Sequence, residues 1–219
     1  IEVTLQTCDF YVTSLNGCAK FAALLYKSRR CLPDEKLKLL LLAMAEGEQI
    51  ATATAPAFSS NLFAGELATS LYSLGCYQAA IVCYERALAF QPENDTLWWK
   101  RGMALYKLGH YEQATISYNQ ALRLQPKQSE FWYNKGLALR KLNRYEEAIA
   151  SYQIAIDLQP NRADFWNSYG IVLRKIGRLD EAISCYNKAL KLNQNNPNYW
   201  YNRGIALDDL GNYVEALAS

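Results

Sequence analysis

The stretch Trp132-Tyr-Asn-Lys-Gly136 places a tryptophan four residues before a glycine. The same arrangement recurs at Trp98–Gly102, Trp166–Gly170 and Trp200–Gly204, and each glycine follows the last by 34 residues. A period of this length is typical of a solenoid built from helix-turn-helix repeats. Because such an array presents a long surface, the sequence directs attention to a binding face before a catalytic centre.

Small and aromatic residues recur in the same register. With the glycine numbered as position 8, alanine occupies positions 20 and 27, and tyrosine occupies position 24. Position 20 is Ala80, Ala114, Ala148, Ala182 and Ala216, position 27 is Ala87, Ala121, Ala155 and Ala189, and position 24 is Tyr84, Tyr118, Tyr152 and Tyr186. Small residues let two antiparallel helices approach closely, and the aromatic residues at positions 4 and 24 fill the remaining gaps. We therefore expect the tryptophans to be packing residues.

Turn signals separate the expected helices. A glycine or asparagine that tolerates positive φ follows each first helix, at Gly75, Gly109, Asn143, Gly177 and Gly211. Acidic residues then begin the second helix in the last four repeats, where they complement its dipole. Proline at position 32 is expected to end the second helix. Where Gln194 replaces that proline, Pro197 is expected to do a similar job.

This set of positions resembles the tetratricopeptide repeat (TPR), over residues 61–219. The resemblance implies an all-α fold, a right-handed α-solenoid of antiparallel helix pairs (a TPR superhelix). Within the family, the repeats of this chain are similar to those of bacterial-type multi-repeat arrays. The repeats are expected at about 61–94, 95–128, 129–162 and 163–196, with an incomplete one at 197–219. The first is degenerate, because Ala64 and Ala68 replace the aromatic residue and the glycine.

Residues 1–60 lack the repeat and form an expected N-terminal helical segment. Apolar residues there recur at roughly helical spacing. We expect a helical hairpin that covers the first repeat, or alternatively the tail of another domain. The apolar run Leu39–Ala45 is far shorter than the ~20 residues that a membrane span needs. Because the sequence begins at Ile1 and stops part-way through a repeat at Ser219, a neighbouring domain outside these residues is one expectation.

Composition narrows the function classes. The formal net charge is +2 without a lysine-arginine block, so we expect no nucleic-acid partner. The six cysteines show no C-x-x-C spacing, which favours reduced, buried thiols in a cytoplasmic protein without a metal. The single histidine, His110, falls in an expected turn, and no catalytic or phosphate-binding motif occurs. We expect no enzyme activity, no catalytic residues and no cofactor.

The TPR resemblance implies a binding groove on the concave side, lined chiefly by positions 2, 5, 6, 9, 12 and 13 of the first helices. The candidate groove residues are Trp99, Lys100, Met103, Tyr133, Asn134, Leu137, Arg140, Asn167, Ser168, Ile171, Arg174, Tyr201, Asn202 and Asp208. Asn134 and Asn202 match the asparagine ladder by which some such arrays hold a peptide backbone. The carboxylate clamp of chaperone-binding arrays is not recognisable.

A basic stripe follows positions 12 and 13 of three repeats, and it has two explanations. Arg140 and Arg174 are expected to meet carboxylates of an acidic peptide. Alternatively, cations in the last turn of a helix offset its dipole by about 0.3–1 kcal/mol. Asp208 and Asp209 stand at these positions in the last repeat. They are expected to pair with basic residues of a partner or of a following repeat.

Two functions remain open at this stage. The first is a protein-interaction scaffold that binds a protein or peptide segment, acidic in character, in the concave groove. The second is a substrate-recruiting or regulatory arm of a larger enzyme, a glycosyltransferase or kinase, with its catalytic domain outside this chain. Self-association through the open C-terminal repeat is a further expectation.

Overall fold

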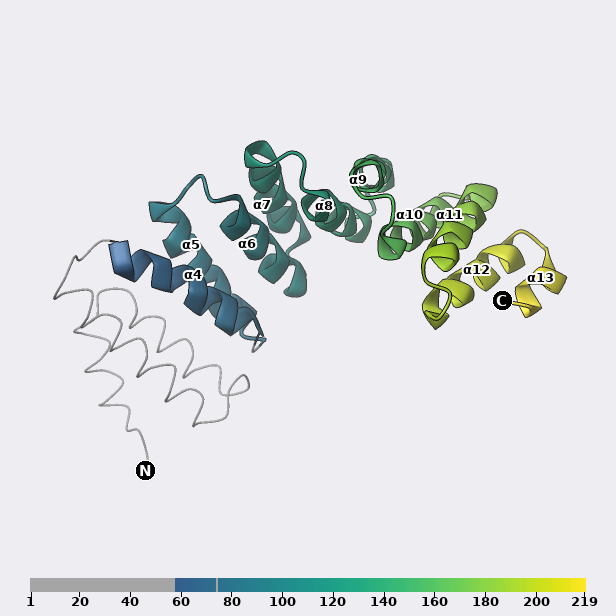
Figure 1. Cartoon of the computed structure of the whole chain (residues 1–219), viewed down its shortest axis with the longest axis horizontal. Coiled ribbons are helices and arrows are strands. Elements are labelled where there is room, and N and C mark those ends of the chain that lie inside the picture. Colours follow the sequence, from purple (N-terminus) through teal and green to yellow (C-terminus); the bar gives the residue numbers. More distant parts are fainter. Residues whose placement is uncertain (1–57, 74) are drawn as a thin grey trace, which may run out of the picture. The chain divides into compact units, whose positions relative to one another are not determined.

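The computed structural model describes residues 58–73 and 75–219, and every element in these ranges is an α-helix (Figure 1). The chain divides into two compact units, Ile1–Gly109 and His110–Ser219. The predicted N-terminal helical segment lies outside the described residues up to residue 57, and its last three positions, expected to precede the first repeat, are the first residues of α4 (Phe58–Ser73). None of the described helices is both long and apolar enough to cross a membrane.

The described part of the first unit holds three helices. These are α4 (Phe58–Ser73), α5 (Tyr77–Phe90) and α6 (Asp95–Lys107). Helix α4 packs on α5, and α5 packs on α6. Ala68, Leu71 and Tyr84 are fully or almost fully buried in this packing. The alanine that replaces the glycine of the first repeat is therefore still a small residue at a close helix contact.

The second unit continues the same order of helices. It contains α7 (Tyr111–Leu124), α8 (Ser129–Lys141), α9 (Tyr145–Leu158), α10 (Ala163–Lys175), α11 (Leu179–Leu192), α12 (Pro197–Asp209) and α13 (Tyr213–Leu217). Each helix packs on the next one in the chain, and α10 also contacts α8 and α12. The prediction of an all-α solenoid of consecutive helix pairs is confirmed.

The tyrosine at position 24 fills the space between the two helices of a pair. Tyr152 and Tyr186 are completely buried. A Cβ atom added to Gly136 would lie 2.7 Å from Cε1 of Tyr152, and one added to Gly170 would lie 2.7 Å from Cε1 of Tyr186. The glycine at position 8 is thus required by the ring beneath it, and the predicted close packing of small and aromatic residues is confirmed.

The tryptophans at position 4 have a more specific role than gap filling. Each is only partly buried, and each indole N–H donates a 2.8 Å hydrogen bond to the carbonyl six residues earlier. The acceptors are the carbonyls of Pro92, Pro126, Pro160 and Gln194, at position 32. The tryptophan therefore holds the turn that joins one repeat to the next.

The turns inside each pair have the predicted backbone. Gly75, Gly109, Gly177 and Gly211 have φ between 81° and 84°, and Asn143 has φ 58°. The predicted role of proline, in contrast, needs correction. Helix α11 ends at Leu192, two residues before Gln194, as the other second helices end two residues before proline. Pro197 does not end that helix, because it is the first residue of α12.

Candidate functional site

Three first helices of the second unit, α8, α10 and α12, share one face. Three side-chain bridges connect residues 35 apart in the sequence: Tyr133 to Ser168, Asn167 to Asn202, and Arg174 to Asp209. Each bridge joins one position of a repeat to the following position of the next repeat. Because these residues touch across successive first helices, the predicted positions 5, 6, 12 and 13 lie on one continuous surface.

We call this surface the first-helix face. It comprises Tyr133, Asn134, Leu137 and Arg140 on α8, Asn167, Ser168, Ile171 and Arg174 on α10, and Tyr201, Asn202 and Asp208 on α12, with Asp209 added by its bridge to Arg174. Of the predicted residues of these three repeats, the bridges join Tyr133, Asn167, Ser168, Arg174 and Asn202 across the helices. That the remaining residues, including the exposed Asp208, belong to a binding surface stays a prediction.

Tyr133 is largely committed to the contact between two repeats. Its ring stacks on Phe165 with 4.5 Å between the ring centroids, and its hydroxyl shares a 3.1 Å hydrogen bond with Ser168. Burial raises the pKa of Tyr133, while Ser168 and the nearby charge of Arg140 act in the opposite direction. The aromatic side chain open to a ligand is instead Tyr201, with 68% of its surface exposed.

The asparagine side chains of this face make hydrogen bonds within the protein, which the predicted asparagine ladder did not include. Asn202 donates a 2.8 Å hydrogen bond to the side-chain oxygen of Asn167, and Asn134 donates to the backbone carbonyl of Glu130 in its own helix. An amide group has two donors and an acceptor with two lone pairs, so each amide retains further hydrogen-bonding capacity. The bridge between Asn167 and Asn202 fixes the orientation of both groups.

Of the two arginines on the first-helix face, Arg174 has a carboxylate partner and Arg140 does not, among the described residues. Nη1 of Arg174 lies 2.9 Å from the carboxylate of Asp209. The expectation that Asp209 pairs with a partner or a following repeat is corrected by this contact with the preceding repeat. Among the described residues, Arg140 has no carboxylate within salt-bridge distance. Leu137 and Ile171 lie between the charged and amide positions and are partly buried against the core.

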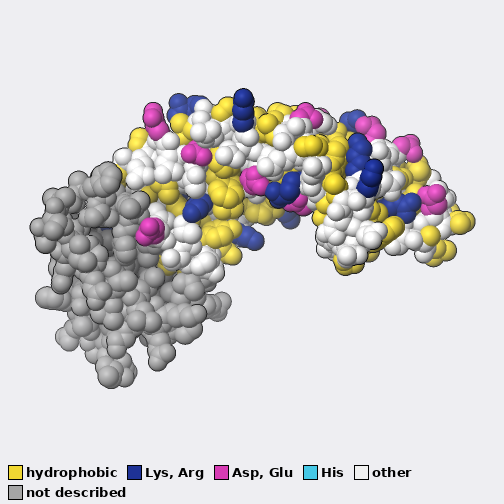
Figure 2. Space-filling model, in the orientation of Figure 1, with side chains coloured by type: hydrophobic (Ala, Val, Ile, Leu, Met, Phe, Trp, Pro, Cys, Tyr) yellow, Lys and Arg dark blue, Asp and Glu magenta, His cyan; other side chains and the backbone are white. Residues whose placement is uncertain are grey.

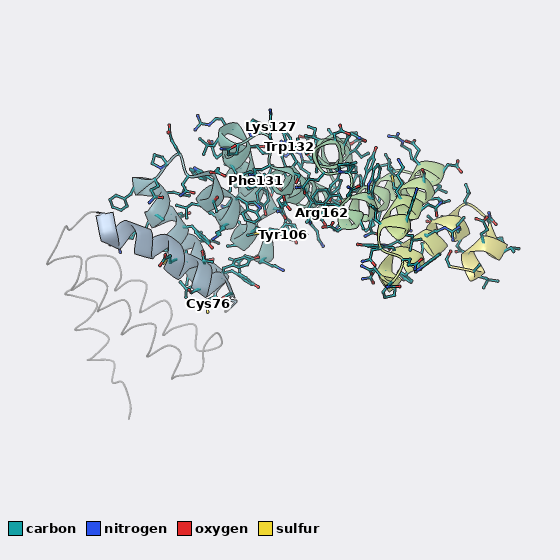
Figure 3. All side chains as sticks on the ribbon, viewed as in Figure 1. Cys76, Tyr106, Lys127, Phe131, Trp132 and Arg162 are labelled. Atoms are coloured by element: carbon teal, nitrogen blue, oxygen red, sulfur yellow. The ribbon has the colours of Figure 1, made fainter. Side chains whose placement is uncertain are left out.

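A charged network beside this face was missed by the sequence analysis. The guanidinium of Arg162, labelled in Figure 3, contacts Glu130 at 2.6 Å and Asp164 at 2.8 Å, and it lies 4.5 Å from the ring centroid of Phe165. Burial would raise the pKa of Glu130, but hydrogen bonds from Arg162 and Ser129 hold that pKa below its ordinary value. The sequence did contain a signal for this network, because the position of the charged Arg162 holds an uncharged asparagine or glutamine in the other repeats.

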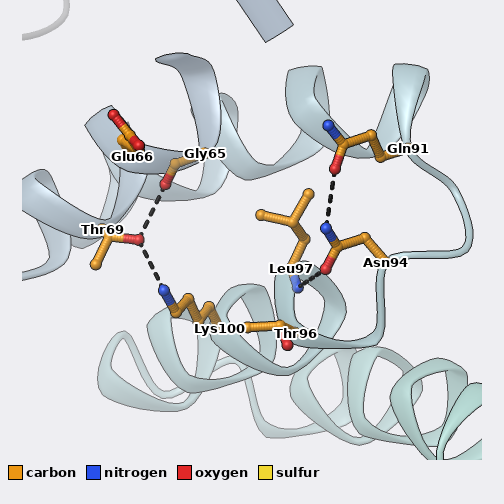
Figure 4. A pocket seen from close by; sticks show the side chains of 8 residues that line it. All are labelled: Gly65, Glu66, Thr69, Gln91, Asn94, Thr96, Leu97 and Lys100. Carbon is orange, nitrogen blue, oxygen red and sulfur yellow. Dashed lines mark hydrogen bonds between the residues drawn. The ribbon is translucent and has the colours of Figure 1, made fainter. Parts of the chain in front are cut away.

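In the first unit, Lys100 lines a pocket of about 260 Å³ (Figure 4). Its ammonium donates a 3.1 Å hydrogen bond to Thr69, and Asn94 on the opposite side bonds Gln91 at 2.9 Å. The pocket is lined by Gly65, Glu66, Thr69, Gln91, Asn94, Thr96, Leu97 and Lys100. The other two predicted residues of this unit, Trp99 and Met103, are partly buried and do not line the pocket.

The visible surface carries both signs of charge. In Figure 2, lysine and arginine side chains are interspersed with aspartate and glutamate side chains over the described part of the molecule. Within residues 58–73 and 75–219, no group of histidine, cysteine, aspartate and glutamate side chains has the arrangement of a metal site. In the C-terminal helix α13, Val214 is 82% exposed and Leu217 is 91% exposed. Self-association through this end stays a prediction.

Comparisons with known proteins agree with this architecture. Tetratricopeptide repeat models match residues 100–163, 133–197 and 185–218, and a TPR repeat model matches residues 69–109. Together these matches span more than half of the chain. No curated protein sequence matches it.

Several solved structures are similar to the chain. MamA has 24% identity and a TM-score of 0.68, covering 72% of this chain and 86% of its own. MamA from Desulfovibrio magneticus RS-1 has 19% identity and a TM-score of 0.69, with coverage of 72% and 89%. YrrB, described as a TPR protein with an unusual peptide-binding site, has 23% identity, a TM-score of 0.65 and coverage of 80% and 88%. At these identities the likeness shows the fold.

Proposed function

Because this chain belongs to the tetratricopeptide repeat family, we propose that it is a protein-interaction scaffold that binds an extended segment of a partner protein along its first-helix face. The observation that carries this proposal is the set of bridges between residues 35 apart. They hold side chains from three repeats on one surface. A preorganised surface loses less conformational entropy when a ligand binds than a flexible one does.

The chemistry of the face suits a peptide. The amides of Asn134, Asn167 and Asn202 can donate to backbone carbonyls and accept from backbone N–H groups of a ligand. Tyr201 offers a broad, exposed aromatic surface for an apolar side chain. YrrB, which shares this fold, is described as having a peptide-binding site, and that description supports a peptide ligand here.

The proposed activity is binding without catalysis, in the cytoplasm. The recruiting arm of a larger enzyme stays an alternative prediction, because the same face would serve that role. The pocket around Lys100 belongs to the corresponding surface of the first unit, and we include it as a second place where a segment of the partner binds.

A peptide-array screen followed by calorimetric titration tests the proposal. The double variant Asn167→Ala/Asn202→Ala and the single variant Tyr201→Ala should each weaken binding of the selected peptides. A lost hydrogen bond is worth about 0.5–1.5 kcal/mol, which corresponds to roughly a 2- to 12-fold loss of affinity. Asn119→Ala is the matched control, because Asn119 is an exposed asparagine on the second helix α7.

The two sets of variants separate the faces of the molecule. Circular dichroism must first show that all variants keep the helical content of the wild type. If Asn119→Ala weakens binding as much as the first-helix variants do, or if none of them changes it, the ligand binds elsewhere and the proposal fails.

A further inference from the structure

Arginine occupies position 12 in two successive repeats, but its surroundings differ. Arg174 on α10 reaches across to Asp209, at position 13 of α12, and forms an ion pair of 2.9 Å. One repeat earlier, Arg140 on α8 has Lys175 of α10 at the corresponding position. In the 35-residue register, the aspartate that pairs with the second arginine therefore corresponds to a lysine for the first.

Arg140 is not a fully solvated surface cation. The residue is partly buried, and its Nε, like that of Arg174, is shielded from solvent without a hydrogen bond, so the two arginines differ in their carboxylate partner and not in burial. It lies on the same side of α8 as Tyr133, seven residues earlier, and its charge acts on the Tyr133 hydroxyl. A partly desolvated cation without a counter-ion is unfavourable, whereas an anion held there gains both charge attraction and nearby hydroxyl groups.

The helix dipole favours Arg140 and Arg174 equally, because both lie in the last turns of their helices, so it does not explain why only Arg174 has a carboxylate partner. Lys141 and Lys175 are exposed in the last turns of their helices, as the dipole favours. An exposed lysine in the last turn needs no partner across the groove. The same backbone positions one repeat later hold an arginine and an aspartate in direct contact, which shows that position 12 can take up an anionic oxygen from the direction of the next first helix.

We propose that Arg140 and Lys175 form a binding site for one oxyanion of the ligand, the carboxylate of an acidic side chain or a phosphate monoester, and that Arg174 does not bind such a group. The inference rests on the proposed function and deepens it. A peptide with its acidic residue over α8 and α10 is preferred, while Asp209 already fills the equivalent place between α10 and α12. The protein should therefore select for an acidic group at one defined position of the ligand, the position that meets Arg140 and Lys175.

Two charge exchanges test the assignment within the intact chain. Lys175→Asp gives Arg140 the neighbour that Arg174 has, so it should close the site. Asp209→Lys removes the counter-ion of Arg174, so it should open a second site. Lys141→Asp is the matched control, because it makes the same charge change in the last turn of α8 without altering the position that faces Arg140.

Nuclear magnetic resonance of the arginine Nε–H groups reports anion binding directly, with inorganic phosphate and acetate as separate probes. In the wild type, the Arg140 signal should shift saturably and the Arg174 signal should not. Lys175→Asp should abolish the shift at Arg140, Asp209→Lys should produce one at Arg174, and Lys141→Asp should leave both as in the wild type. A response to phosphate alone identifies a phosphate monoester as the natural group, and a response to acetate identifies a carboxylate.

Peptide affinities give the second readout. For a nonapeptide selected by the array, replacing its acidic residue by glutamine should weaken binding to the wild type about fivefold, an effect that salt reduces. Lys175→Asp should remove this difference while the glutamine peptide binds as before. Equal responses of Arg140 and Arg174 to the anions, or an unchanged peptide ratio in Lys175→Asp, would overturn the inference. If peptides fail to bind the first-helix face at all, the proposed function fails instead, while the anion titration still decides the site.

Discussion

Replacing Gly136 by alanine tests the packing between the two helices of a repeat. The added Cβ would lie 2.7 Å from Cε1, 2.8 Å from Cδ1 and 3.0 Å from Cζ of Tyr152. Carbon atoms prefer a separation of about 3.5–4.0 Å, so α8 and α9 must separate or the ring must move. Tyr152 is completely buried, which leaves the ring no open space.

The magnitude follows from two opposing effects. Overpacking of a dense core costs about 1–3 kcal/mol, and the helix propensity of alanine returns about 1 kcal/mol relative to glycine. Since two of the contacts are shorter than 3.0 Å, the cost should lie in the upper part of its range. We expect Gly136→Ala to lower the free energy of unfolding by about 1–2 kcal/mol.

Gly204→Ala provides the matched control at the same repeat position. There the added Cβ meets only the Cβ of Ser219 at 3.3 Å and the carbonyl oxygen of Ala216 at 3.5 Å. The gain in helix propensity should dominate, and stability should stay the same or rise by up to about 1 kcal/mol. Guanidinium unfolding followed by far-UV circular dichroism and tryptophan fluorescence measures both variants. If the two substitutions have the same effect, the ring beneath Gly136 is not the reason for the glycine.

Two further predictions concern the turns and the thiols. Trp132→Phe keeps an aromatic ring but removes the hydrogen bond to the Pro126 carbonyl, so it should lower the free energy of unfolding by about 0.5–1.5 kcal/mol; unchanged denaturant midpoints would show that the bond does not hold the turn. Burial raises the pKa of Cys185 to about 11, so little thiolate is present at neutral pH. Its alkylation by iodoacetamide in the native protein should be slow and should accelerate with pH up to that value, and mass spectrometry showing equal rates in native and denatured protein would contradict this.

The sequence predicted the features that depend on contacts within one repeat. The positive φ of Asn143 and the burial of Tyr152 each follow from a residue type at a fixed position. The end of α11 did not follow in this way. Its last turn closes with a hydrogen bond from the Asn193 N–H to the Ala189 carbonyl, as the other second helices close theirs, although proline is missing from position 32. Proline at position 32 is therefore not required for a second helix to end there.

The candidate site was predicted less completely, because its properties arise between repeats. The sequence placed Tyr133 among the candidate groove residues, but it could not show that Phe165 and Ser168 of the next repeat contact this residue. In the same way, Arg174 was identified as a cation without its partner Asp209. These contacts depend on how one first helix is aligned with the next. The alignment is visible only once residues 35 apart are seen to touch.

The repeats also show where specificity should reside. Successive first helices have the same backbone arrangement, so a difference at one position must come from side-chain chemistry. Between α10 and α12, the amide of Asn202 and the guanidinium of Arg174 both have partners within the chain. Between α8 and α10, the hydroxyls of Tyr133 and Ser168 are bridged, but the charge of Arg140 is not neutralised. The ion pairs of Arg162 with Glu130 and Asp164 lie at the first turns of α8 and α10, whereas Arg140 in the last turn of α8 has no carboxylate partner among the described residues. An anionic group of a ligand would therefore not compete with an internal ion pair of Arg140. Charge selection should be concentrated at that junction, with α12 contributing contacts that do not depend on ligand charge.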